Sequence, residues 1–91
     1  MNSIEKIVAL LLAGDRVQWI ASSAYTGMFV PHQVTSLLNI KEGRDRFHVI
    51  GNRIAERDGG VVFSWTVDKD APLPEGAIRM EEEREFLQEP H

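Results

Sequence analysis

The chain has 91 residues, no cysteine and a formal net charge of −4 at pH 7. This length fits one domain with a small core, which leaves little room for a large catalytic cleft. The absence of cysteine excludes a disulfide framework and a thiolate metal site, and we expect a cytoplasmic protein. No segment approaches the ~20 consecutive apolar residues of a membrane span, so no membrane association is expected.

Charge is distributed unevenly along the chain. Residues 1–57 contain seven Lys or Arg and five Asp or Glu, whereas residues 58–91 contain three and nine. The overall acidity argues against a protein whose whole surface binds phosphate. The mildly basic first part can still attract DNA locally. The acidic second part can be solvated, can repel phosphate, or can contact another protein.

Three helices are predicted before the first strand. Ser3 suits the N-cap of a helix over residues 4–13, and Gly14 suits its end. A second helix begins at Arg16 or Val17 and runs to Tyr25, and Gly27 ends it. Its predicted apolar face consists of Val17, Ile20, Ala21 and Ala24.

The third helix covers residues 30–43. Pro31 is suited to the first turn of a helix and Gly43 to its end. Between the second and third helices, Met28 and Phe29 lie in a turn. Large apolar residues are most often buried, so we expect both in the core, with an exposed partner contact as the alternative.

The segment from Phe47 to Val67 predicts one long β-hairpin around Asp58-Gly59, because a two-residue turn of this kind favours Asp and Gly. One face of the hairpin is then apolar and the other carries Arg53 and Arg57. The predicted facing pairs are Glu56 with Val61, Ile54 with Phe63, Asn52 with Trp65 and Ile50 with Val67.

This order of elements resembles the winged helix-turn-helix family, in particular the small regulators of bacteria and their phages, over roughly residues 3–70. The resemblance implies an α+β fold of three helices followed by a two-stranded β-hairpin wing. It divides the chain into a winged helix-turn-helix domain over residues 1–70 and an acidic, partly disordered tail over residues 71–91. The turn before the third helix is longer than a tight helix-turn-helix has.

The resemblance also implies a sequence-selective, double-stranded DNA-binding protein that regulates transcription. The third helix would enter the major groove and the wing would touch the DNA backbone. On its exposed face, the residues suited to base contacts are His32, Gln33, Thr35, Ser36 and Asn39. The expected phosphate contacts are Lys41, Arg44, Arg46, Arg53 and Arg57.

No enzyme, metal or cofactor is predicted. His32 and His48 do not fall at metal-ligand spacing with a carboxylate, and no Ser, His and acid arrangement is suggested by spacing.

The alternative function is a protein-interaction module, an adaptor or an inhibitor, that contacts its partner through Met28, Phe29 or the acidic tail. Homodimerisation through the first helix or the tail is a further expectation. The two functions differ in where the arginines lie. A surface shared with Gln33 and Asn39 favours DNA, whereas interleaving with Glu42, Asp45 and Glu56 favours a protein partner.

Overall fold

The computed structural model describes residues 2–82, which form two helices and five strands. In chain order these are α1 (Ser3–Leu12), β1 (Arg16–Ile20), α2 (Ala24–Glu42), β2 (Phe47–Ile50), β3 (Arg53–Glu56), β4 (Val61–Thr66) and β5 (Ala77–Glu81). The predicted fold of three helices and a two-stranded wing is therefore wrong. The protein is α+β with a five-stranded mixed sheet.

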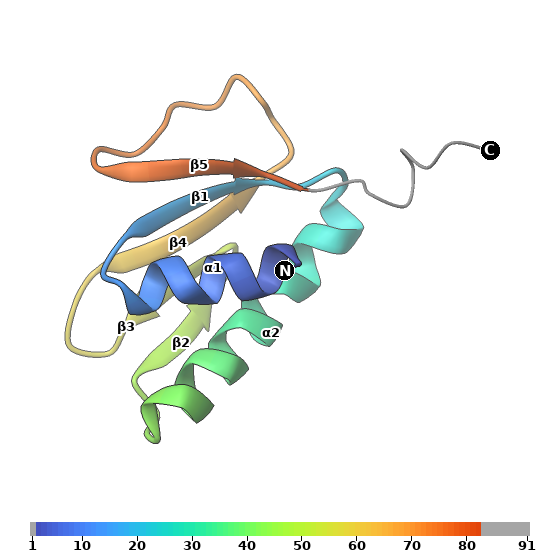
Figure 1. Ribbon diagram of the computed structural model, residues 1–91. Helices are drawn as coiled ribbons and strands as arrows, with labels where there is room; N and C mark the ends of the chain where they lie inside the picture. Colours follow the sequence, from blue (N-terminus) through green and yellow to red (C-terminus); the bar gives the residue numbers. More distant parts are fainter. Residues whose placement is uncertain (1, 83–91) are drawn as a thin grey trace.

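The strand order in the sheet is β2-β3-β4-β1-β5. Strands β2, β3 and β4 are antiparallel neighbours, whereas β1 is parallel to both β4 and β5. Both helices cover the same face of the sheet (Figure 1). Their apolar sides meet that face in one core, whose members are Ile7, Val8, Leu11, Val17, Trp19, Ala21, Val30, Val34, Leu38, Phe47, Ile54 and Phe63.

Strand β1 occupies the place where a second helix was predicted, and its burial explains the error. It lies between two other strands and is buried on both faces from Val17 to Ile20. A strand covered on both faces lacks the alternation that identifies a half-buried strand, so its apolar residues fell at helical spacing instead. The buried Gln18 side chain is satisfied there, because its amide N–H donates to the Pro72 carbonyl at 2.9 Å and its amide oxygen accepts from Arg79 Nε at 3.0 Å.

Helix α2 joins the end of the predicted second helix to the predicted third one. Gly27 and Pro31, which indicated a stop and a new start, both lie inside it on its buried side. They are four residues apart, so the N–H that Pro31 lacks would have bonded to the Gly27 carbonyl, and one bond of the ladder is lost. The predicted end is confirmed, because Gly43 takes the left-handed conformation at φ +70°.

Helix α1 lies within one residue of its predicted bounds. Its N-cap is Asn2 rather than Ser3, since the Asn2 side chain accepts from the Glu5 N–H at 2.9 Å. Neither α1 nor α2, the helices of the described part, has the length and apolarity that a membrane span requires.

The predicted hairpin is split into three strands. Gly51, at φ +59°, lies in a turn between β2 and β3, so Ile50 pairs with Arg53 and not with Val67. The predicted pairing of Ile54 with Phe63 is confirmed. An irregularity beyond that pair places Ala55, instead of Glu56, opposite Val61.

Residues 77–81 fell within the predicted tail but form the edge strand β5, parallel to β1. The part of the tail from residue 83 to residue 91 lies outside the described residues. Glu82, just after β5, joins this strand to the start of α2. Its carboxylate accepts from the Thr26 hydroxyl at 3.1 Å and from the backbone N–H and hydroxyl of Ser22. A negative charge is favourable at a helix N-terminus.

We expect Glu82→Gln to lower the free energy of unfolding by about 1 kcal/mol, because glutamine keeps the shape of the side chain but removes its charge. Urea denaturation measures the change. Glu81→Gln is the matched control, since Glu81 is 64% exposed and its carboxylate lies 3.7 Å from Lys69 in an exposed ion pair. Equal effects of the two substitutions would show that the Glu82 contact does not stabilise the fold.

Candidate functional site

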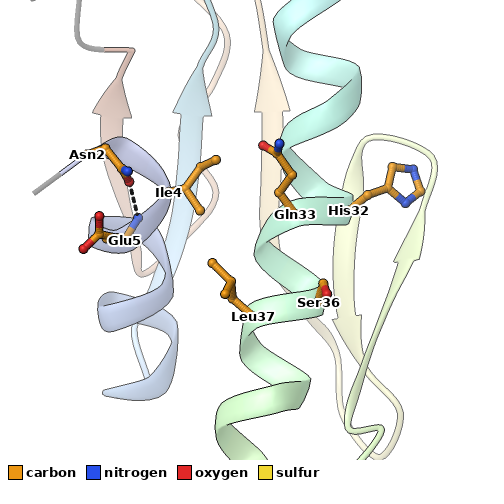
Figure 2. Close-up of a pocket in the computed structure, with 7 residues that line it drawn as sticks. All are labelled: Asn2, Ile4, Glu5, His32, Gln33, Ser36 and Leu37. Carbon is orange, nitrogen blue, oxygen red and sulfur yellow. Dashed lines mark hydrogen bonds between the residues drawn. The ribbon is translucent and has the colours of Figure 1, made fainter.

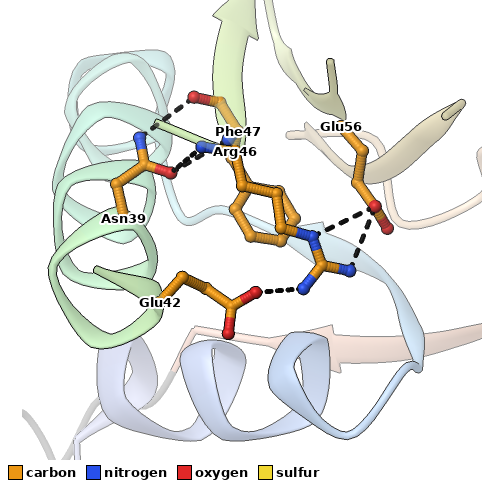
Figure 3. A network of polar contacts seen from close by, with 5 residues as sticks. All are labelled: Asn39, Glu42, Arg46, Phe47 and Glu56. Atoms are coloured by element: carbon orange, nitrogen blue, oxygen red, sulfur yellow. Dashed lines mark hydrogen bonds and ion pairs between the residues drawn. The ribbon is translucent and has the colours of Figure 1, made fainter. Parts of the chain in front are cut away.

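Four of the predicted phosphate contacts gather around the C-terminal end of α2, and acidic residues are interleaved with them. These four are Lys41, Arg44, Arg46 and Arg57. The Arg46 guanidinium lies between two carboxylates (Figure 3), donating to Glu42 through Nη1 and to Glu56 through Nη2 at 3.0 Å. The hydrogen bonds to Glu42 and Glu56 raise the pKa of Arg46 above its ordinary value, and the bond to Glu42 has the larger effect. Arg46 therefore serves an internal network.

The other arginines do not complete a phosphate surface. Arg57 pairs with Asp45 at 3.0 Å, and both side chains are more than half exposed, so the pair itself contributes little stability. Arg53 is exposed, and its neighbour Ile54 is fully buried in the core beneath the helices. Successive strand residues point to opposite faces, so Arg53 lies on the side of the sheet away from α2.

Asn39, predicted to contact a base, instead links α2 to β2. Its Oδ1 accepts from the backbone N–H groups of Arg46 and Phe47, both at 2.9 Å, and its amide donates to the Phe47 carbonyl at 3.0 Å (Figure 3). A further bond runs to Asp45 at 3.3 Å. The side chain thus satisfies the backbone at the start of an edge strand, where no second strand is available.

The remaining predicted base contacts lie on α2. His32, Gln33 and Ser36 are exposed on its outer side, away from the sheet. Thr35 is half-buried, and its hydroxyl has no hydrogen-bond partner within residues 2–82.

An open groove of about 610 Å³ runs between the first turns of α1 and the middle of α2 (Figure 2). Ile4 and Leu37 supply its apolar side chains. The polar residues that line it are Asn2, Glu5, His32, Gln33 and Ser36. The ten predicted contacts therefore do not form one surface, because most lie on α2 or around its C-terminal end and Arg53 lies on the opposite side of the sheet.

Large apolar side chains are exposed on the outer side of α2 and at both of its margins, and we call this set the α2 stripe. Its members are Tyr25 (71% exposed), Met28 (55%), Phe29 (49%), Leu37 (36%) and Ile40 (71%). The rings of Tyr25 and Phe29 pack edge to face at 5.3 Å. The expectation that Met28 and Phe29 lie in the core is thus wrong. An apolar patch of this kind marks a place of contact more often than isolated exposed residues do.

The α2 stripe lies on a surface nearly free of charge. No Asp, Glu, Lys or Arg occurs from Ala24 to Ile40, and α2 carries charge only at Lys41 and Glu42. Depletion of charge with enrichment of aromatic residues and methionine characterises the centre of protein interfaces. No protein-family model, curated protein or solved structure matches the chain. The functional inference therefore depends on geometry, and the winged-helix resemblance gains no support from related proteins.

Proposed function

We propose that this protein is a protein-binding module that contacts its partner through the α2 stripe. The observation that carries the proposal is the exposed half of α2, free of charge over four turns, on which five large apolar side chains remain exposed. A partner that removes these apolar side chains from water stabilises the complex.

The partner segment that fits this surface is an amphipathic helix. A partner strand would need free backbone N–H and C=O groups to pair with, and the outer side of α2 offers side chains only. A helix can instead place its side chains in the groove beside α2, where Ile4 and Leu37 are apolar. His32, Gln33 and Ser36 add neutral hydrogen-bonding groups at the rim.

Double-stranded DNA is the second candidate, and the positions of the arginines disfavour it. Arg46 and Arg57 are paired with carboxylates, and Arg53 lies on the other side of the sheet from the outer side of α2. A duplex that reached the end of α2 would also meet Glu42, Asp45 and Glu56, which repel phosphate. Acidic residues are thus interleaved with the arginines, which is the arrangement expected for a protein partner.

Selection from a displayed library of helical peptides tests the proposal. We expect binders that carry apolar residues at i, i+3, i+4 and i+7, and we expect Phe29→Glu to abolish their binding. Ile50→Glu is the matched control, because Ile50 is also about half exposed, at 54%, but lies on β2. Binders that are lost equally with both variants, or no binders at all, would contradict the proposal.

Fluorescence anisotropy with random double-stranded DNA tests the second candidate. We expect no saturable binding even at low salt, where phosphate contacts are strongest. Binding that weakens steeply with salt, and that falls further in Arg53→Ala with Arg57→Ala, would favour DNA over a protein partner.

A further inference from the structure

We infer that the C-terminal segment of this chain, residues 83–91, occupies the groove between α1 and α2 when no partner is bound, with Phe86 and Leu87 against its apolar side chains. The inference rests on the proposed function, because the groove belongs to the surface that binds the partner helix. The partner then competes with a segment of the chain itself, and this competition regulates binding.

The described part of the chain ends on the side of α2 that carries the groove. The Glu82 carboxylate accepts a hydrogen bond from the Thr26 hydroxyl at 3.1 Å, in the first turn of α2. Gln33 and Leu37, which line the groove, follow Thr26 by seven and eleven residues. These spacings are about two and three helical turns, so the three side chains lie along one side of α2. The segment that follows Glu82 therefore starts in line with the groove.

The length of the C-terminal segment matches the distance to the apolar part of the groove. Leu37 lies about 16 Å from Thr26 along the axis of α2, at ~1.5 Å per residue. A chain spans at most ~3.3–3.6 Å per residue, so Phe86 and Leu87 can reach about 14 and 17 Å from the last described residue. They can thus meet Ile4 and Leu37, which point toward each other from the two helices (Figure 2).

Charge and connectivity favour this occupant. Glu5 is the one Asp, Glu, Lys or Arg among the described residues that line the groove. The C-terminal segment has a single Lys or Arg, Arg84, two positions before Phe86, so Arg84 can pair with Glu5 when Phe86 lies in the groove. A segment joined to its binding surface by a short linker has a millimolar effective concentration, so contacts that are weak between separate molecules suffice here.

A nitroxide spin label tests this contact on the full chain, and the lack of cysteine makes an introduced thiol unique. With the label on Gln88→Cys, we expect the amide signals of Ile4 and Leu37 to broaden. The same label in a variant that also carries Phe86→Ser and Leu87→Ser should leave these signals sharp, because the apolar contacts are removed. Signals that broaden equally in the two labelled proteins, or that broaden in neither, would overturn the inference.

The affinity for a helical peptide from the displayed library measures the regulation. We expect Phe86→Ser with Leu87→Ser to bind the peptide at least about threefold more tightly than the unsubstituted chain, because the peptide no longer competes with the C-terminal segment. Leu73→Ser is the matched control, since Leu73 is also exposed, at 46%, but lies between β4 and β5, and it should leave the affinity unchanged. Equal affinities of the double variant and the unsubstituted chain would overturn the inference.

Failure of this contact and failure of the proposed function give different results. A peptide that binds the double variant and the unsubstituted chain equally would leave the protein-binding function standing and would remove the C-terminal segment from the groove. If no peptide binds either protein, the proposed function is contradicted, whereas the spin label still shows whether the C-terminal segment occupies the groove.

Discussion

Asn39→Ala is expected to lower the free energy of unfolding by about 2–3 kcal/mol. The substitution leaves the N–H groups of Arg46 and Phe47 and the Phe47 carbonyl without their side-chain partner at a part-buried position. A buried polar group that loses its partner costs about 1–3 kcal/mol, and several groups share this one side chain. Urea denaturation followed by tryptophan fluorescence measures the loss.

Two further variants separate a linking role from a surface role for Asn39. Asn39→Asp keeps an acceptor for the two N–H groups, but its second carboxylate oxygen would face the Phe47 carbonyl and the Asp45 carboxylate, so we expect a loss close to that of Asn39→Ala. Ser36→Ala, in the same helix, changes an exposed side chain and should shift the free energy by less than about 0.5 kcal/mol. An Asn39→Ala variant as stable as Ser36→Ala would show that α2 and β2 are not joined by this residue.

Gly27→Ala is expected to destabilise the protein by about 2–3 kcal/mol. A Cβ atom at this position would lie 2.5 Å from Cε3 and Cζ3 of Trp65, and the indole ring cannot move aside as the tip of a flexible chain could. Helix propensity alone predicts the opposite sign, because alanine is favoured over glycine by about 1 kcal/mol inside a helix. The sign of the measured change therefore decides whether α2 packs this closely on the sheet.

A double-mutant cycle identifies the ring as the cause. Trp65→Leu removes the aromatic atoms that the new Cβ would meet, so the combined variant should be more stable than the sum of the two single changes predicts. Additive effects would place the cost of Gly27→Ala elsewhere in the helix.

Local signals predicted those parts of the fold that depend on neighbouring residues. The first helix, the end of α2 at Gly43 and the pairing of Ile54 with Phe63 follow from capping, glycine conformation and strand alternation. The prediction that Gly27 ends a helix is wrong, because a glycine in a sequence can have either of two structural roles. A glycine can end a helix, or it can allow close packing inside one, and only the contact with Trp65 distinguishes them.

The rest of the fold depends on contacts between distant residues. β1 is a central strand because β5, about 60 residues later, completes the sheet beside it, and the buried Gln18 is satisfied in part by Arg79 from that distant strand. Propensity gives no sign of such partners. The edge strand β5 itself was hidden among proline and acidic residues, which favour loops and tails.

The candidate site was predicted in part. Met28 and Phe29 were recognised as the alternative contact for a protein partner, but the rest of the α2 stripe was not, since residues 24–42 were not expected to form one helix. Once they do, Tyr25, Met28 and Phe29 fall at helical spacing on one side. The ion pairs of Arg46 could not be predicted without the fold, because Glu56 reaches Arg46 from β3.

The most direct test of the α2 stripe is a titration of the ¹⁵N-labelled, unsubstituted protein with a helical peptide selected from the displayed library, followed by ¹H–¹⁵N correlation spectra. We expect shifts for the outer side of α2, from Tyr25 to Ile40, and for the facing turn of α1 near Ile4. Shifts centred on the edge strand β5 or around Arg53 would contradict binding through the α2 stripe.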